Sequence, residues 1–77
     1  MKFEELFVGQ KFKDLEIHEG RILKITRIVD DNANHCDENA KVYFVSDNEE
    51  EDWYRAWFFM DENRCRALNK KVRFIFR

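Results

Sequence analysis

Apolar residues recur at every second position in several short runs of this chain, and this period constrains the fold more than any other feature. Leu23 and Ile25 alternate with polar neighbours, and residues 72–76 alternate in a similar way. A period of two places successive side chains on opposite faces of a strand, whereas an amphipathic helix needs a period of about 3.6. The sequence therefore predicts a mainly β protein and disfavours an all-α fold.

Five strands are expected, joined by turns that depend on Asn and Asp, because the chain has no proline and two glycines. Their expected ranges are 7–13, 21–29, 42–45, 53–59 and 72–76. One helical turn is expected over residues 3–6 and another after Asp61, where Cys65 and Leu68 share a face. The 77 residues are about half the usual length of a domain, so residues 1–77 are expected to form a single domain.

The core of so short a chain depends on its large apolar side chains, because a small domain buries a modest share of its surface. Hydrophobic residues make up 44% of the sequence and aromatic residues 16%, which is sufficient for a small core. The residues expected to form that core are Val8, Phe12, Leu23, Ile25, Phe44, Phe58, Leu68, Val72 and Phe74.

The order of the expected elements resembles that of an SH3-like barrel, with a long first loop, a three-strand meander, a helical turn and a closing strand. The opening FEELFVGQKFK is similar to the F-x-x-L-x-V-G-x-x-F start of small barrel proteins that are common in bacteriophage genomes. There the glycine, Gly9 in this chain, lies in the turn that leads into the first strand. The resemblance implies an all-β, five-stranded SH3-like barrel with one short helical turn before the last strand. It also implies a small binding protein that acts on host or phage machinery.

Catalytic and metal-binding patterns are missing from the sequence. Ser46 and Thr26 are the only hydroxyl nucleophiles of their types, and neither lies in a nucleophile motif. His35 and Cys36 are adjacent, so on an extended segment their side chains point apart. The cysteines and histidines lack zinc-site spacing, and the acidic run lacks the pattern of a calcium loop. We therefore expect no enzymatic activity, no cofactor and no bound metal.

The cysteine count and the hydropathy pattern bear on the compartment. Cys36 and Cys65 are too few for the disulfide framework of a small secreted domain, although one bridge between them remains an alternative. No stretch approaches the ~18 apolar residues of a membrane span. We expect a cytoplasmic protein without a membrane partner, in the bacterial host cytoplasm if the phage resemblance holds.

The net charge of −2 conceals an uneven distribution. Residues 30–52 carry nine acids and one base, whereas residues 63–77 carry six bases and no acid. The two segments either neutralise each other across the fold, or the acids engage a basic partner and steer its approach. A simpler role for the acids is to keep the protein soluble and to protect a strand edge from pairing.

Residues 53–59 are apolar on both faces of the strand expected there, and this predicts a contact surface. If Phe58 points into the core, Trp57 points away, and Trp53 and Arg55 leave on the same side. Tryptophan beside arginine is typical of the strongly binding residues of protein interfaces. The residues expected to contact a partner protein are Trp53, Arg55 and Trp57, with Glu49, Glu50 and Glu51 guiding encounter.

Two alternatives to this surface remain open. The N-terminal turn, through Phe3 and Leu6, would cover the tryptophans and make them part of the core. The second alternative is a nucleic-acid-binding barrel, because small barrels bind single strands by stacking bases on aromatic side chains within a basic groove. The net acidic charge of the chain argues against nucleic acid as the first choice.

Overall fold

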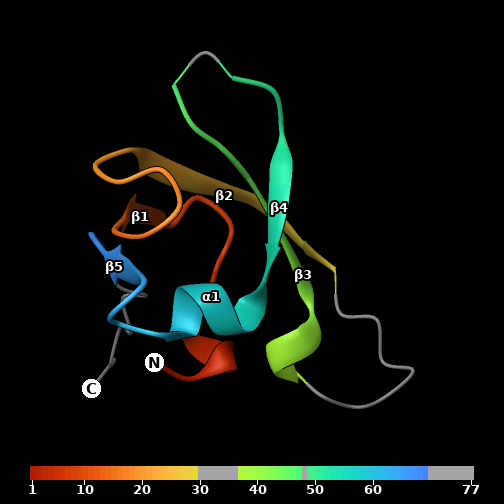
Figure 1. Ribbon diagram of the computed structural model, residues 1–77. Helices are drawn as coiled ribbons and strands as arrows, with labels where there is room; N and C mark the ends of the chain where they lie inside the picture. Colours follow the sequence, from red (N-terminus) through yellow and green to blue (C-terminus); the bar gives the residue numbers. More distant parts are fainter. Residues whose placement is uncertain (30–36, 48, 70–77) are drawn as a thin grey trace, which may run out of the picture.

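Five antiparallel strands form one sheet in the computed structural model, which describes residues 1–29, 37–47 and 49–69 (Figure 1). The strands are β1 (Lys11–Asp14), β2 (Ile22–Val29), β3 (Lys41–Val45), β4 (Asp52–Arg55) and β5 (Cys65–Ala67). Their order in the sheet is β4-β3-β2-β1-β5. The helical elements are η1 (Phe3–Glu5), η3 (Asp37–Asn39) and α1 (Ala56–Met60). The prediction of a mainly β protein is therefore confirmed.

The middle of the sheet follows the sequence closely. The strands expected at 21–29 and 42–45 are β2 and β3, and the helical turn expected at 3–6 is η1. The first strand, expected at 7–13, begins only at Lys11, because residues 7–10 form a turn around Gly9. The φ angle of Gly9 is 93°, a backbone conformation that residues with a Cβ rarely adopt.

The prediction of a strand over residues 53–59 is wrong for the second half of that range. β4 ends at Arg55, and the chain continues as the helix α1. Phe58 and Phe59 are both buried in the same core. Consecutive residues of a strand point to opposite faces, so a strand cannot bury both on one side, whereas a helical turn against the core can.

The segment after α1 also differs from the prediction. In place of a helical turn bearing Cys65 and Leu68, the chain makes a tight turn and then forms β5. The Asp61 carboxylate accepts a hydrogen bond from the Asn63 backbone N–H at 2.9 Å, which closes this turn. The closing strand expected at 72–76 lies outside the described residues, and β5 is a strand that the sequence pattern did not predict.

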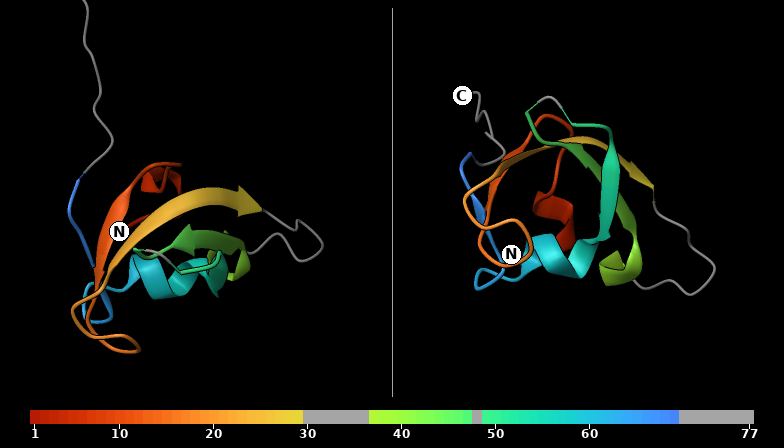
Figure 2. Two further views of the ribbon diagram at one scale, coloured as in Figure 1. Left: turned by 90° about the horizontal axis from the view of Figure 1, so that it is seen from above. Right: turned by 45° about the horizontal axis from the view of Figure 1, so that its top comes forward.

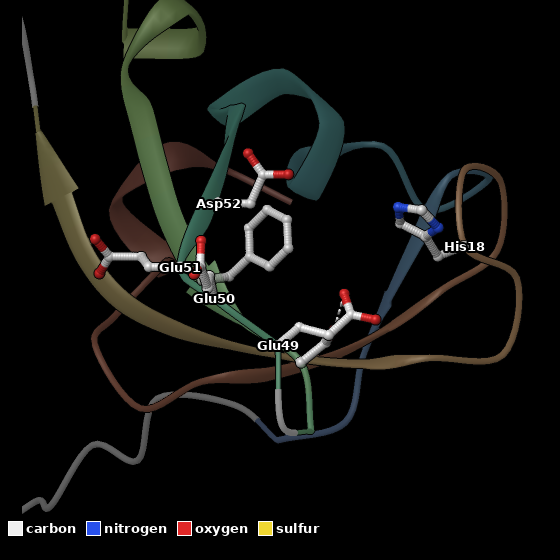
Figure 3. Close-up of a pocket in the computed structure, with 7 residues that line it drawn as sticks. His18, Glu49, Glu50, Glu51 and Asp52 are labelled. Atoms are coloured by element: carbon white, nitrogen blue, oxygen red, sulfur yellow. Dashed lines mark hydrogen bonds between the residues drawn. The ribbon is translucent and has the colours of Figure 1, made fainter.

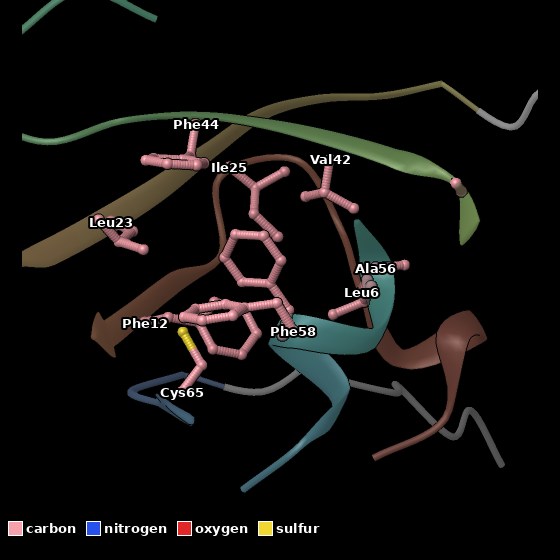
Figure 4. Close-up of a cluster of buried hydrophobic side chains, with 11 residues drawn as sticks. Leu6, Phe12, Leu23, Ile25, Val42, Phe44, Ala56, Phe58 and Cys65 are labelled. Atoms are coloured by element: carbon pink, nitrogen blue, oxygen red, sulfur yellow. The ribbon is translucent and has the colours of Figure 1, made fainter. Parts of the chain in front are cut away.

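The curled sheet encloses the core on one side, and α1 and the N-terminal turn lie against the same side (Figures 2 and 4). Five of the predicted core residues are buried, namely Phe12, Leu23, Ile25, Phe44 and Phe58. Val8 and Leu68 are exposed, contrary to prediction, because they lie in the turn before β1 and beyond the end of β5. Val72 and Phe74 lie outside the described residues.

The outer face of the sheet is the side turned away from this core. Within the described ranges, β4 and β5 are the two edges and do not pair with each other, so the sheet is open. Phe12 and Leu23 pair across β1 and β2 and are buried, so their neighbours Lys11 and Lys24 lie on the outer face. The same alternation places Tyr43, which lies between the buried Val42 and Phe44 on β3, on the outer face.

Candidate binding surface

Trp53 belongs to a row of side chains that crosses the outer face of the sheet. Tyr43 on β3 pairs with Trp53 on β4 and with Arg27 on β2. Directly paired residues of antiparallel strands lie on the same face, so the three side chains are neighbours. Trp53 is 38% exposed, and the N-terminal turn does not cover it, because Phe3 and Leu6 pack with the core instead.

Positively charged groups lie over both rings of this row. The Arg27 guanidinium is 3.8 Å from the centre of the Tyr43 ring. The Lys41 ammonium and the Arg55 guanidinium lie 4.8 and 4.9 Å from the ring of Trp53. These are cation–π contacts, each of which contributes about 0.5–1 kcal/mol at an exposed site. We refer to the group as the cation–aromatic cluster; it consists of Arg27, Lys41, Tyr43, Trp53 and Arg55.

Hydrogen bonds hold the polar ends of the cluster. Thr26 Oγ1 donates to Glu51 Oε2 at 2.6 Å, and Arg27 Nη2 donates to Glu51 Oε1 at 3.1 Å. The bond from Thr26 is the main cause of the lowered pKa of Glu51, and Arg27 adds to it. Arg55 Nη1 donates to the backbone oxygen of Asn39 at 2.9 Å. Glu51 therefore neutralises Arg27, while Arg55 is held by a neutral acceptor.

Trp57 does not join this row, contrary to the strand-based prediction. It lies on α1, is 41% exposed, and has the Arg64 guanidinium 4.9 Å from its ring. Arg64 is itself held by Glu16 at 3.2 Å and by Asp61 at 3.1 Å. The structure thus divides the predicted surface in two, with Trp53 and Arg55 on the sheet and Trp57 beside Arg64 on the helix.

The acids predicted to guide encounter line a cavity of about 510 Å³ near the β3–β4 connection, together with Phe44 and Ser46. Figure 3 shows His18 on the opposite side of this cavity from Glu49, Glu50 and Asp52. Glu49 forms an ion pair with Arg21. Glu50, by contrast, has no ion-pair partner within the described part of the chain. The cavity is acidic and open, and it borders the cation–aromatic cluster through Glu51.

Asp14 is a buried carboxylate that the sequence analysis missed. Its Oδ1 accepts hydrogen bonds from the backbone N–H groups of Glu16 and Ile17 at 2.9 and 3.0 Å. Its Oδ2 accepts from the N–H of His18 at 3.1 Å and from the Tyr54 hydroxyl at 3.4 Å. Burial and the nearby Asp14 carboxylate both raise the pKa of Tyr54. Asp14 therefore holds the connection between β1 and β2, one wall of the acidic cavity.

Cys65 is fully buried, and its thiol makes the free energy of unfolding depend on pH in the alkaline range. Burial, and then the charge of Asp14, raise the pKa of its thiol from 9.0 to about 12. The folded state holds this proton more tightly than the unfolded chain, so the free energy of unfolding falls as pH rises from about 9 to 12. We expect Cys65→Ala to reduce this slope in denaturant titrations. Equal slopes for the two proteins would contradict the assignment.

The sequence analysis also missed Arg27, Lys41 and Tyr43. Their signal was present, because each occupies an outward position in a strand whose neighbours Val42 and Ile28 are apolar. Which of these residues become neighbours depends on the register between β2, β3 and β4. That register shifts between Ile25 and Arg27 of β2. A single sequence does not reveal such a shift, because it changes which residues are opposite without changing the pattern of either strand.

Among the described residues, no group of three or more His, Cys, Asp or Glu side chains is arranged to hold a metal ion. No helix in the described segments is long and apolar enough to cross a membrane. No protein-family model matches the sequence, and searches among curated proteins and solved structures find no significant match.

Proposed function

We propose that this chain is a small, non-enzymatic binding module that contacts a macromolecular partner through its cation–aromatic cluster. The observation that carries the proposal is the position of the paired rings of Tyr43 and Trp53 on the outer face, with cations fixed over them. Trp53 lies outside the buried core, and its ring contacts both Lys41 and Arg55. Ordered aromatic and arginine side chains at a surface are the typical strong contributors to an interface.

The fold that we propose for the module is an SH3-like barrel. The strand order supports it, because a meander of four strands is followed by a short helix and by a strand that pairs with β1. The phage-type opening supports a small protein of the bacterial host cytoplasm. Its turn at Gly9, which leads into β1, agrees with the place that the glycine holds in that pattern.

The sequence favours a protein as the partner, and the module is proposed to modulate or inhibit that protein. Trp57 and Arg64 on the α1 side offer it a surface independent of the outer sheet face. The acids Glu49, Glu50 and Glu51 flank the sheet and would speed the approach of a basic protein at low salt. Nucleic acid is the alternative partner, and the cations around Trp53 favour it.

The proposal is tested by capture from bacterial lysate with the immobilised protein, before and after nuclease treatment. Trp53→Ala is expected to reduce a specifically retained partner about tenfold or more, because the indole is a central contact. Trp57→Ala is the matched control, because its indole lies on α1 beside Arg64 and outside the cation–aromatic cluster. Both variants are expected to melt close to the parent, since both indoles are exposed.

A partner that survives nuclease treatment and is lost with Trp53→Ala would then be purified, and its binding measured directly. A partner retained equally by both variants, or lost only with Trp57→Ala, would contradict binding through the cation–aromatic cluster. Retention of nothing beyond an unrelated control protein, with and without nuclease, would contradict the proposed function as a whole.

A further inference from the structure

Four cations cross the outer face on the side of the sheet away from Trp53. Lys11 and Lys13 project from β1, Lys24 from β2 and Arg66 from β5, and all four are exposed. The strand neighbours of each are buried or packed against the core, which places the side chain on the outer face. We call these four residues the basic strip.

The basic strip places like charges directly opposite each other. Lys11 pairs with Lys24 across β1 and β2, and Lys13 pairs with Arg66 across β1 and β5. Directly opposed like charges destabilise an antiparallel pair. Within the described ranges, no carboxylate forms an ion pair with any of the four. The fold therefore holds a repulsion here that the sheet itself does not relieve.

Two arginines elsewhere in the described segments are neutralised by carboxylates. Arg21 pairs with Glu49, and Arg64 pairs with both Glu16 and Asp61. The outer face differs, because its one neutralising contact in the described segments is that between Glu51 and Arg27. The described acids other than Asp14 and Asp52 lie outside the strands, so the net charge of −2 of the whole chain conceals a basic outer face.

The basic strip and the cation–aromatic cluster lie on one continuous face. The register offsets them, because β1 pairs with residues 22–24 of β2 whereas Tyr43 pairs with Arg27, so Lys24 lies roughly 10 Å along the strands and roughly 10 Å across them from Trp53. An extended single strand that crosses the face diagonally can place its phosphates over the basic strip and a base at Trp53. Phosphates along this path meet the basic strip, whose cations form no ion pair within the described segments, and a base at its end meets Trp53, which is 38% exposed beside Lys41 and Arg55.

We propose that the outer face binds single-stranded nucleic acid, with its phosphates over the basic strip and a base stacked on Trp53. The stacking of a base on Trp53 rests on the proposed function of the cation–aromatic cluster, whereas the binding of phosphates by the basic strip rests on the like-charge pairs alone. Planar rings among cations suit a single strand, whose bases are free to stack. A duplex keeps its bases stacked inside, and an acidic protein would engage the cations without needing the rings.

The test is fluorescence anisotropy with labelled oligo(dT) and oligo(rU) of about 20 nucleotides, together with a duplex of equal length. We expect the single strands to bind more tightly than the duplex. Their affinity is expected to fall steeply between about 50 and 200 mM salt, with a log–log slope of about −0.7 per neutralised phosphate.

The decisive variants remove one charge of each like-charge pair, as Lys24→Gln and Lys13→Gln. Each is expected to weaken binding about three- to tenfold at low salt and to make the slope shallower by about 0.7. Each is also expected to melt at or above the parent temperature, because the repulsion is relieved. Lys2→Gln is the matched control: Lys2 is exposed in the N-terminal segment and its variant is expected to bind as the parent does.

Stacking is read from tryptophan fluorescence in a Trp57→Phe background, which leaves Trp53 as the only indole. Heparin is a polyanion without bases. Quenching of the Trp53 fluorescence by oligo(dT) but not by heparin supports the proposal. The proposal would be overturned if Lys2→Gln lost as much affinity as the strip variants. It would also be overturned if heparin bound as tightly as the single strand and the Trp53 fluorescence did not change, or if only an acidic protein bound. No oligonucleotide binding at low salt would also overturn it, while a nuclease-resistant partner lost with Trp53→Ala would still sustain the proposed function.

Discussion

Phe59→Ala is expected to cost about 3–5 kcal/mol of folding free energy, the range measured for removing a buried phenylalanine ring. Phe59 is 1% exposed, and its ring contacts Phe12 at 5.0 Å and Phe44 at 5.9 Å between centroids. It therefore joins α1 to the strands on both sides of β2. A domain of this size has a total stability of about 4–12 kcal/mol, so the loss is a large fraction of the whole.

The measurement is chemical denaturation followed by circular dichroism, with two companion variants. Phe59→Leu keeps most of the volume and is expected to lose a smaller part, which gives a result even if Phe59→Ala does not fold. Trp57→Ala changes the neighbouring exposed residue and is expected to cost less than about 1 kcal/mol. A Phe59→Ala protein as stable as the parent, or a Trp57→Ala protein that unfolds, would show that α1 faces the other way.

The helix α1 marks the limit of what the sequence pattern predicts. A period of two was sufficient for β2 and β3, because side chains alternate between a more buried and a less buried face along each strand. The run from Trp53 to Met60 is apolar at nearly every position, so it fits a strand apolar on both faces and a strand followed by a helix equally well. What decides is the tertiary position of the segment, which continues the sheet to Arg55 and then turns under the core.

The candidate surface shows the same limit at the level of single residues. Trp53 and Arg55 were predicted together and are in contact, because both lie on the strand part of the segment. Trp57 was predicted with them and lies instead beside Arg64, because the alternation ends where the helix begins. The basic strip was not predicted, since the like-charge pairs of β1 join residues that are distant in sequence.

Asp14→Ala is expected to cost about 2–4 kcal/mol, the second largest effect among the predictions, because the Asp14 carboxylate accepts three backbone hydrogen bonds from residues 16–18. Removing it leaves those donors without their acceptor in a connection that closes through Gly20, whose N–H donates to the Asp14 backbone oxygen at 2.8 Å. For a domain of this size, each kcal/mol shifts the melting temperature by about 4–8 °C.

Hydrogen exchange separates a local role of Asp14 from a general loss of stability. The amides of Glu16, Ile17 and His18 are expected to lose protection in Asp14→Ala beyond the loss seen across β2 and β3. Tyr54→Phe is the matched control, because it removes only the longer 3.4 Å bond to the same carboxylate and is expected to cost little. Asp14→Ala with parental melting and unchanged exchange would mean that the connection between β1 and β2 is held by its backbone alone.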